Sequence, residues 1–339
     1  MPDGKTGIAL LSMAHVHARG YADQVASMPE CQIIALWDED PERGQAEAEK
    51  RGVPFTTDLS GVLAQSAVEA VVVNAPTALH KEIFLAAADA GKHIFTEKSL
   101  TITLEDATEV VNAVEAAGIK FMISLPARTR PEILFAKKAL DEGLLGEVTL
   151  MRARIAHMAA LDRWFSGGSA WFGDEAQAGG GAFFDLGCHR VDIMRWFLGE
   201  PASVVAQMGN FSGAYDIDDN MVAVVTFQSK AIGILDVSWV QRSGPNPLEI
   251  YGTAGYLGIE AAPNGPRIQL ISSQVTCGDI QGYVVPSSLP PAQPSPLQQW
   301  VAAIREGTPP AITIKDGWNL VQMLEGCYTA GRNGHEVTF

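Results

Sequence analysis

The chain has 339 residues, of which 47% are hydrophobic and 19% charged. This composition is typical of a soluble globular protein and excludes fibrous and disordered classes. A single hydrophobic core rarely serves so many residues, so we expect two domains. The formal net charge of −15 disfavours nucleic acids and anionic membranes as partners, because both are negatively charged.

The segment MPDGKTGIALLSM has too short an apolar run for a signal peptide, and no later run is long enough to cross a membrane. Four cysteines lie far apart without CxxC spacing, which predicts neither a disulfide framework nor a zinc site. They are Cys31, Cys188, Cys277 and Cys327. We therefore expect a reduced, cytoplasmic protein without a bound metal.

The first third of the chain alternates short apolar runs with longer segments of helical pattern. The apolar runs are GIALLSM (7–13), QIIALWD (32–38), AVVVNAP (70–76), HIFTEK (93–98) and KFMIS (120–124). Helical patterns cover 41–51, 79–90 and 104–117, and glycine follows each of them. Strand and helix in alternation predict a parallel sheet with helices on both faces.

Beyond residue 124 the pattern changes to strand-like runs, several with alternating polarity. These runs are EVTLMRARIAH, ASVVAQMGNF, NMVAVVTFQ, AIGILDVSWV, PLEIYG and PRIQLIS, with a hairpin connection expected at 228–230. A strong helix is expected over 182–198, and the proline-rich stretch 286–296 should be an extended surface connection. The pattern predicts a mainly antiparallel sheet.

The segment LLSMAHVHA (10–18) joins the first strand to the first helix. Dinucleotide-binding proteins carry GxGxxG here and hold the pyrophosphate on backbone amides at the start of the helix. Ser12, Ala14 and His17 occupy the three glycine positions. Serine and alanine are small enough for the backbone to approach a phosphate, although they tolerate positive φ less well than glycine. The alternative is a plain strand and turn.

Asp38 closes the second strand within WDEDPER. A carboxylate about 20 residues after the loop is where such proteins bind the ribose 2′-hydroxyl. Glu39 and Asp40 should repel a 2′-phosphate, so we expect NAD rather than NADP. A solvated strand end or a helix cap is the alternative role for Asp38.

Two further segments, NAPTALHKEIFLAAADAGKHIFTEKS (74–99) and AGGGAFFDLGCHRVDIMRWFLG (178–199), resemble the Gfo/Idh/MocA oxidoreductases, the family of glucose-fructose oxidoreductase and inositol dehydrogenase. The shared patterns are a proline-centred turn followed by histidine, an EKP motif, and GGG…D…H. The resemblance extends to DGWNLVQMLEGCYTAGRNGHEV (316–337). It implies a Rossmann domain, here 1–123, then a substrate-binding and oligomerisation α/β domain, 124–339, with a large open, mainly antiparallel sheet. It also implies a homo-oligomer, a dimer or a tetramer.

By position, Lys98 matches the family's active-site lysine, and Asp185 with His189 matches its carboxylate and histidine pair. Their i and i+4 spacing places Asp185 and His189 on one face of a helix. Oxidation of a secondary alcohol needs a base for the hydroxyl proton, and a neutral imidazole suits that role. We assign His189 as the base, Asp185 as its orienter and a hydroxyl acceptor, and Lys98 as the cation that polarises the reacting oxygen. A solvated lysine, a core histidine and a helix cap are the structural alternatives.

Within the EKP motif the chain has Ser99 in place of proline. A cis bond before a residue other than proline costs about 3 kcal/mol, so we expect the Lys98–Ser99 bond to be trans. Pro126 also stands where relatives often have asparagine, which bears on the pocket around the nicotinamide.

The residues expected to contact the cofactor are Ser12, Met13, Ala14, His15, Val16, Asp38, Asn74, Ala75, Pro76, His80 and Glu97. Arg128, Arg163 and Trp171 are expected to contact substrate, because aromatic faces with a few directional donors fit a hydroxyl-rich ring. Aromatic side chains that close a core beneath a long loop are the alternative.

Together these features predict an NAD-dependent oxidoreductase that transfers a hydride between nicotinamide and a secondary alcohol of a sugar, sugar derivative or cyclitol. One alternative is a redox-neutral lyase or glycosidase that uses bound NAD transiently. Another is a non-catalytic sensor of a dinucleotide or other ligand.

Overall fold

The computed structural model describes residues 4–260, 265, 267–275 and 283–339. The chain forms two compact units, and neither is continuous in sequence. The first comprises Met1–Ser124, Ser166–Gly179 and Ser295–Val321, and the second comprises Leu125–Phe165, Gly180–Pro294 and Gln322–Phe339. The structure therefore differs from the continuous division into 1–123 and 124–339, because two later segments pack with the first unit. Trp300 of one such segment is fully buried, and its ring centroid lies 5.7 Å from that of Phe95.

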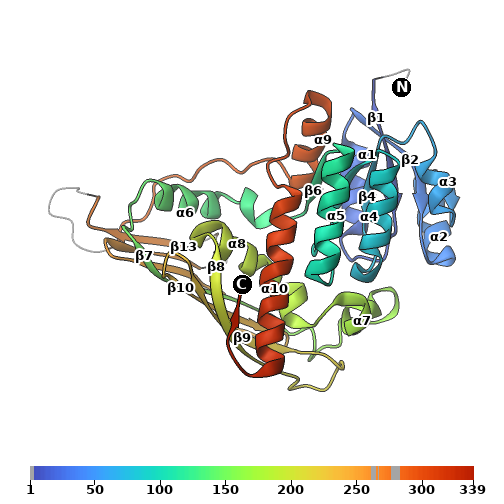
Figure 1. Cartoon of the computed structure of the whole chain (residues 1–339). Helices are drawn as coiled ribbons and strands as arrows, with labels where there is room; N and C mark the ends of the chain where they lie inside the picture. Colours follow the sequence, from blue (N-terminus) through green and yellow to red (C-terminus); the bar gives the residue numbers. More distant parts are fainter. Residues whose placement is uncertain (1–3, 261–264, 266, 276–282) are drawn as a thin grey trace. The chain divides into compact units, whose positions relative to one another are not determined.

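The first unit contains a six-stranded parallel sheet of order β3-β2-β1-β4-β5-β6, the Rossmann order that was predicted. Its strands are β1 (Thr6–Leu11), β2 (Cys31–Trp37), β3 (Phe55–Thr56), β4 (Ala70–Val73), β5 (His93–Thr96) and β6 (Phe121–Ile123). Its helices are α1 (Ala18–Ser27), α2 (Pro41–Arg51), α3 (Leu59–Leu63), η1 (Thr77–Leu79), α4 (His80–Asp89), α5 (Leu104–Ala117), η3 (Gly167–Gly173), α7 (Glu175–Ala178) and α9 (Pro296–Glu306). Helices α4 and α5 run side by side over the sheet (Figure 1).

The second unit is built on an eight-stranded sheet of order β13-β12-β11-β7-β10-β9-β8-β14. Its neighbouring strands are antiparallel except β7 and β10, which confirms the mainly antiparallel sheet. The strands are β7 (Val148–Ala156), β8 (Pro201–Gly209), β9 (Asn220–Phe227), β10 (Ile232–Ser238), β11 (Leu248–Gly252), β12 (Gly255–Glu260), β13 (Arg267–Ser272) and β14 (Val337–Thr338). The helices are η2 (Pro126–Thr129), α6 (Pro131–Asp141), η4 (Phe183–Gly187) and α8 (Cys188–Leu198), and α10 (Ile314–Asn333) contributes residues to both units.

Two local expectations need refinement. The helix expected over 182–198 consists of a π-helical turn, η4, followed by α8. The proline-rich stretch ends where α9 begins at Pro296, because Ser295 caps that helix through the amide of Gln298. The hairpin between β9 and β10 is present as predicted, and Lys230 within it takes a φ of 72°.

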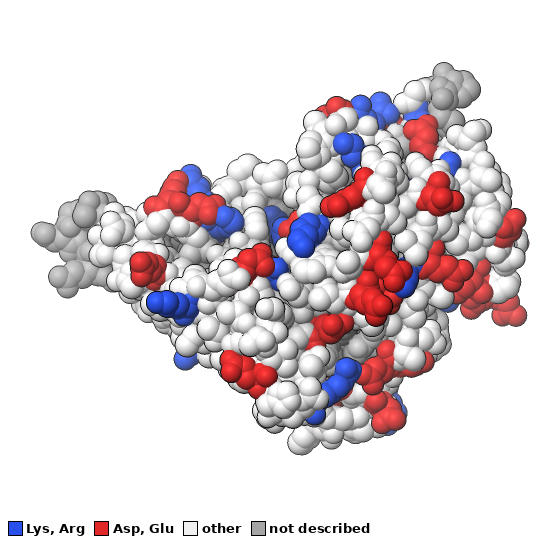
Figure 2. All heavy atoms as spheres, viewed as in Figure 1, with Lys and Arg blue, Asp and Glu red and all other residues white. Residues whose placement is uncertain are grey.

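Within the described residues no helix is both long and apolar enough for a membrane span. Cys31, Cys188 and Cys327 are buried, and Cys188 Sγ donates to the carbonyl of Asp185 at 2.9 Å, while Cys277 lies outside the described residues. Figure 2 shows acidic patches over the part of the first unit that carries α4 and α5, where Lys81 pairs with Asp106 at 2.7 Å. The surface thus reflects the net charge of −15.

Candidate functional site

The loop that joins β1 to α1 keeps a tight turn without glycine. Ser12 is fully buried, has a φ of 70°, and donates its amide to the carbonyl of Trp37 at 2.7 Å. Its hydroxyl accepts the amide of Ala14 at 3.1 Å and donates to the carboxylate of Glu39 at 3.1 Å. Ser12 therefore adopts the left-handed conformation usual for glycine, and its side chain closes the turn.

Most amides of this loop donate to acceptors inside the protein. Besides Ala14, Met13 donates to Asp38 Oδ2 at 2.9 Å, and His15 donates to the carbonyl of Asn74 at 3.0 Å. The amide of His17 donates to His15 Nδ1 at 3.2 Å. For Val16, whose side chain is 59% exposed, the hydrogen bonds found among the described residues include none from its amide. That amide, next to the start of α1, is positioned to bind an anion.

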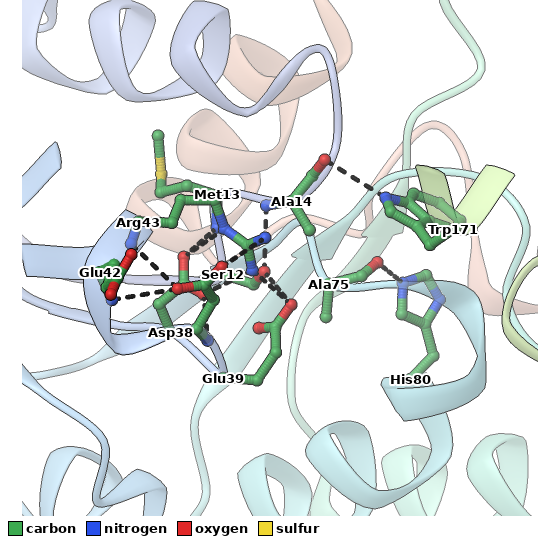
Figure 3. A network of polar contacts seen from close by, with 11 residues as sticks. Ser12, Met13, Ala14, Asp38, Glu39, Glu42, Arg43, Ala75, His80 and Trp171 are labelled. Atoms are coloured by element: carbon green, nitrogen blue, oxygen red, sulfur yellow. Dashed lines mark hydrogen bonds and ion pairs between the residues drawn. The ribbon is translucent and has the colours of Figure 1, made fainter. Parts of the chain in front are cut away.

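Asp38 is fully buried and its carboxylate is already saturated with donors (Figure 3). Oδ1 accepts the amide of Asp40 at 2.8 Å and Arg43 Nη2 at 2.6 Å. Oδ2 accepts Arg43 Nε at 3.0 Å in addition to the amide of Met13. Arg43 also donates to Glu39 at 2.6 Å. Burial, and then the charge of Asp38, raise the pKa of Glu39.

The sequence analysis missed Arg43. The sequence could have indicated a pairing with Asp38, because Arg43 lies on the first turn of α2, five residues after Asp38 in WDEDPER. Asp40, which was interpreted as a repellent charge, caps α2 by accepting the amides of Glu42 at 3.0 Å and Arg43 at 3.1 Å.

Glu97 lies just after β5 and connects several groups of the loop. Its Oε1 accepts the hydroxyl of Tyr21 and lies 3.1 Å from His17 Nδ1, while Oε2 accepts the amide of Lys98 at 3.1 Å. Burial acts to raise the pKa of Glu97, but His15, His17 and Lys98 outweigh it and hold that pKa well below its usual range. Glu97 is therefore an ionised carboxylate that holds the loop.

One cluster of possible metal ligands is formed by His15, His17 and Glu97, whose ligand atoms lie within 4.8 Å of one another. However, His15 Nδ1 accepts the amide of His17, so the neutral ring carries its proton on Nε2. Nε2 is the atom that faces Glu97, at 4.0 Å from Oε2. A metal-ligating histidine needs the opposite arrangement, with its second nitrogen donating a hydrogen bond. The geometry thus fits a cluster that packs the loop against Glu97, in which His17 Nδ1 lies 3.1 Å from Oε1.

The Lys98–Ser99 peptide bond is cis, so the prediction of a trans bond was wrong. That prediction considered the preference of an isolated bond, whereas the surrounding fold also contributes. His80 Nδ1 lies 2.9 Å from the carbonyl oxygen of Ser99 and 3.1 Å from that of Leu100. His80 Nε2 lies 3.1 Å from the carbonyl oxygen of Ala75. The buried imidazole therefore bridges the turns that follow β4 and β5, and Figure 3 shows it beside Ala75.

Asn74 follows β4 and is fully buried. Its carbonyl accepts the amide of His15, but neither polar atom of its side-chain amide has a hydrogen-bond partner among the described residues. Buried polar groups are normally hydrogen-bonded. The Asn74 side-chain amide, in a turn that bonds to the β1–α1 loop through His15, therefore fits a polar ligand such as a dinucleotide. Ala75 and Pro76 complete this turn before η1.

Trp171 and Phe172, on η3, cover the loop. Their ring centroids are 3.9 Å apart, and Trp171 Nε1 donates to the carbonyl of Ala14 at 3.3 Å. The ring of Phe172 lies 5.3 Å from that of His15 and 6.0 Å from Lys98 Nζ. Trp171, which was expected to bind substrate, thus packs on the β1–α1 loop, and Lys98 is buried beside Phe172.

In the second unit, Asp185 lies on η4 and His189 at the first turn of α8. Both side chains are half-buried, whereas Phe184 and Cys188, which precede each of them, are buried. This burial pattern places Asp185 and His189 on the same side of the segment, away from the core contacts.

The two arginines expected to bind substrate have different surroundings. Arg128 makes a bidentate pair with Asp192, at 3.1 Å and 2.6 Å, and its guanidinium lies 5.1 Å from the ring of Trp196. Arg163 is exposed and takes a φ of 49°. The pairing of Arg128 gives it a structural role within the second unit.

Comparison with known proteins agrees with this fold. Residues 9–125 match an oxidoreductase family with an NAD-binding Rossmann fold, and residues 133–258 match the GFO/IDH/MocA C-terminal domain. The chain is 28% identical to 1,5-anhydro-D-fructose reductase of Ensifer adhaerens, over 86% of this chain and 87% of that protein. It is 25% identical to scyllo-inositol 2-dehydrogenase (NAD(+)) of Bacillus subtilis, over 97% and 94%.

Among solved structures, GenD2 from gentamicin A biosynthesis in complex with NAD is similar, with a TM-score of 0.82, 26% identity and coverage of 99% of this chain and 96% of that one. The matched domains, the strand order of the first sheet and the antiparallel sheet of the second unit lead to one conclusion. The chain belongs to the Gfo/Idh/MocA family of oxidoreductases.

Proposed function

We propose that the protein is an NAD-dependent dehydrogenase that acts on a secondary alcohol of a sugar, sugar derivative or cyclitol. The observation that carries the proposal is the β1–α1 loop, which forms the Rossmann turn without glycine and keeps the Val16 amide available at the start of α1. The substrate class is supported by relatives that are named as an anhydrofructose reductase and an inositol dehydrogenase.

In this proposal the nicotinamide dinucleotide supplies the hydride acceptor. His189 would take the proton of the substrate hydroxyl while the carbon that bears this hydroxyl loses its hydride. Asp185 would orient His189 and accept a hydrogen bond from the substrate. The ammonium group of Lys98 polarises the reacting oxygen. Arg128, Arg163 and Trp171 remain the proposed substrate contacts, and Arg128 and Trp171 are held in place by hydrogen bonds to Asp192 and to the carbonyl of Ala14.

The test is an assay of the purified protein with NAD and a panel of inositols, anhydrosugars and aldoses, followed by absorbance of the reduced nicotinamide. Lys98→Ala and His189→Ala should each lower kcat/KM at least ~1000-fold, because each removes a group needed in the transition state. His335→Ala is the matched control, since this histidine is exposed near the end of the chain. Normal turnover in both active-site variants would contradict the assignment. Binding of NADH without turnover of any compound would favour the sensor alternative.

We further propose that the coenzyme is NAD. Asp38, Glu39 and Asp40 surround Arg43, so the carboxylates outnumber the guanidinium and disfavour a 2′-phosphate. To bind the ribose hydroxyls, Asp38 has to exchange its hydrogen bonds with Arg43 for bonds to the sugar. Asp38→Ser removes a carboxylate partner of Arg43, which leaves the guanidinium able to bind a 2′-phosphate. The kcat/KM with NAD divided by that with NADP should therefore fall at least ~10-fold. A wild-type preference for NADP would overturn this choice.

We propose that the open face of the second sheet forms a homo-oligomer. Val205, Val222 and Ile232 lie on one face of neighbouring strands, and these residues are 45%, 42% and 43% exposed. Apolar side chains gathered on one sheet face favour association. Light scattering at micromolar concentration should give a dimer or tetramer mass, and Val222→Lys should shift it towards the monomer. A monomer mass for the wild-type protein contradicts this proposal.

A further inference from the structure

The start of the η4–α8 segment in the second unit has all of its leading amides bonded to two distant residues. Asp218 accepts the amide of Gly181 on Oδ1 at 2.7 Å and that of Phe183 on Oδ2 at 3.2 Å. Its backbone carbonyl accepts the amide of Ala182 at 2.9 Å. The first free amides of a helix normally bond to water or to a local cap. Here a single residue just before β9 satisfies three of them.

Tyr328, on α10, satisfies the fourth amide and holds Asp218 in place. Its hydroxyl accepts the amide of Phe184 at 3.1 Å and donates to Asp218 Oδ1 at 2.8 Å. Asp218 and Tyr328 are 4% and 3% exposed, so water does not compete for these bonds. Burial, together with the charge of Asp218, raises the pKa of Tyr328 well above its usual value, which keeps the hydroxyl protonated as a donor.

The glycines of the motif allow this close arrangement. A Cβ on Gly180 would lie 2.3 Å from the Tyr328 hydroxyl oxygen, and a Cβ on Gly181 would lie 1.9 Å from the carbonyl oxygen of Asp218. Both distances are shorter than any real contact. The glycines therefore allow Asp218 and Tyr328 to reach the backbone directly.

The proposed catalytic groups follow immediately. Asp185 comes directly after Phe184, and its amide bonds to the carbonyl of Gly181 at 3.0 Å. His189 lies about one turn further along, on the same half-buried side. The π-helical turn contains Asp185 and ends directly before α8, which carries His189, and such turns are frequent at functional sites.

From this arrangement we infer that Asp218 and Tyr328 are positioning residues, which set the direction of Asp185 and His189 by fixing the four leading amides of their segment. The inference rests on the proposed function, because it assumes that Asp185 and His189 act on the substrate. It assigns no contact with substrate or cofactor to Asp218 or Tyr328.

The experiment compares Tyr328→Phe with Tyr215→Phe. The Tyr215 hydroxyl accepts the amide of Phe165 at 2.8 Å, so the control removes a similar bond elsewhere in the second unit. Tyr328→Phe should increase hydrogen exchange at least 10-fold in peptides that cover 181–189, and leave the dissociation constant of NADH within twofold of wild type. With the panel compound that the wild-type protein oxidises, kcat should fall at least 10-fold. The isotope effect on kcat, from deuterium at the oxidised carbon, should rise because hydride transfer becomes slower.

Asp218→Asn provides a second variant, since it keeps one oxygen acceptor and nearly the same shape. It should show the same direction in exchange, kcat and isotope effect. The inference is overturned if exchange in 181–189 is unchanged in Tyr328→Phe, or if kcat and the isotope effect match those of Tyr215→Phe within twofold. If the wild-type protein oxidises no compound of the panel, the proposed function fails, and with it the catalytic part of the inference. The exchange measurement still decides whether the two residues hold the segment.

Discussion

The start of α1 in the first unit and the start of the η4–α8 segment in the second present similar sets of backbone amides, and the protein uses them differently. At the second start, Asp218 and Tyr328 bond to all four leading amides. At the first, the side chains of Ser12, His15 and Asp38 bond to the amides of Ala14, His17 and Met13, and the hydrogen bonds among the described residues include none from the Val16 amide. A helix start whose amides are all bonded within the protein fixes the direction of its side chains. A start with an unbonded amide, called the open start below, can bind an anion.

The two starts differ in glycine: the first lacks the glycines of the dinucleotide-binding pattern, whereas the second keeps the GGG of its motif. The proposed cofactor loop has none at the positions where the family pattern requires it, and Ser12 takes the left-handed conformation itself. The second start needs Gly181, because the carbonyl oxygen of Asp218 would lie 1.9 Å from a Cβ there. The comparison teaches that glycine is needed where another group approaches the backbone closely.

The largest expected effect tests this point. Gly181→Ala should destabilise the fold by about 3 kcal/mol or more, since the added methyl overlaps backbone that cannot move independently. Gly20→Ala on α1 is the control, because nothing lies within 4 Å of its Cβ position, and it should raise stability by up to about 1 kcal/mol. Denaturant unfolding measures both changes. Equal free energies of unfolding for the two variants would contradict the comparison.

A second prediction concerns the buried carboxylate beside each start. The pKa of Glu97 is held low, so it contributes stability above its unfolded pKa of 4.5 that is lost as pH falls. Burial raises the pKa of Asp218 despite its hydrogen bonds, so its contribution is present below 3.8 and is lost as pH rises. On acidification from pH 6 to 3, the stability advantage of wild type over Glu97→Gln should shrink, and that over Asp218→Asn should grow.

Each difference should change by at most about 1.4 kcal/mol per pH unit, the limit for one proton. The measurement is the free energy of unfolding of the wild type and both variants at several pH values. Parallel curves for all three proteins would show that these carboxylates have the same pKa folded and unfolded.

The third prediction addresses the open start directly. Val16→Asp places a negative charge on an exposed side chain next to the amide proposed to bind the diphosphate, so the dissociation constant of NADH should rise at least ~10-fold. Val16→Asn has nearly the same shape without the charge and should stay within about threefold of wild type. Fluorescence titration measures both. Equal binding by the two variants would place the diphosphate elsewhere.

Local signals explain what the sequence could predict. The helix over 104–117 was predicted with its observed bounds, because Thr103 caps its start and Gly118 ends it in the left-handed conformation. The parallel and antiparallel sheets followed from the spacing of apolar runs. Asp185 and His189 were predicted on one face of a helix; the structure places Asp185 in the π-helical turn η4 and His189 in α8, and both are half-buried.

What the sequence could not predict depends on residues far apart in the chain. Asp218 and Tyr328 lie 37 and 144 residues from the amides that they bind. The segment Ser166–Gly179, which carries Trp171, packs with the first unit although the segments before and after it belong to the second. The cis bond at Ser99 contradicted a rule for isolated peptides, and His80, which contacts the carbonyl of Ser99 just after that bond, lies 19 residues away.

The smallest expected effect is that of Ser12→Gly, which restores the first glycine of the motif. Glycine removes the cost of a left-handed residue, about 1 kcal/mol, but it also removes the hydroxyl that bonds to Ala14 and Glu39. These contributions are of similar size and opposite sign, so stability should change by less than about 1 kcal/mol. A loss above about 2 kcal/mol, measured by denaturant unfolding, would mean that the hydroxyl is the main element holding the turn. In that case the serine is a structural requirement of this loop, rather than a tolerated replacement for glycine.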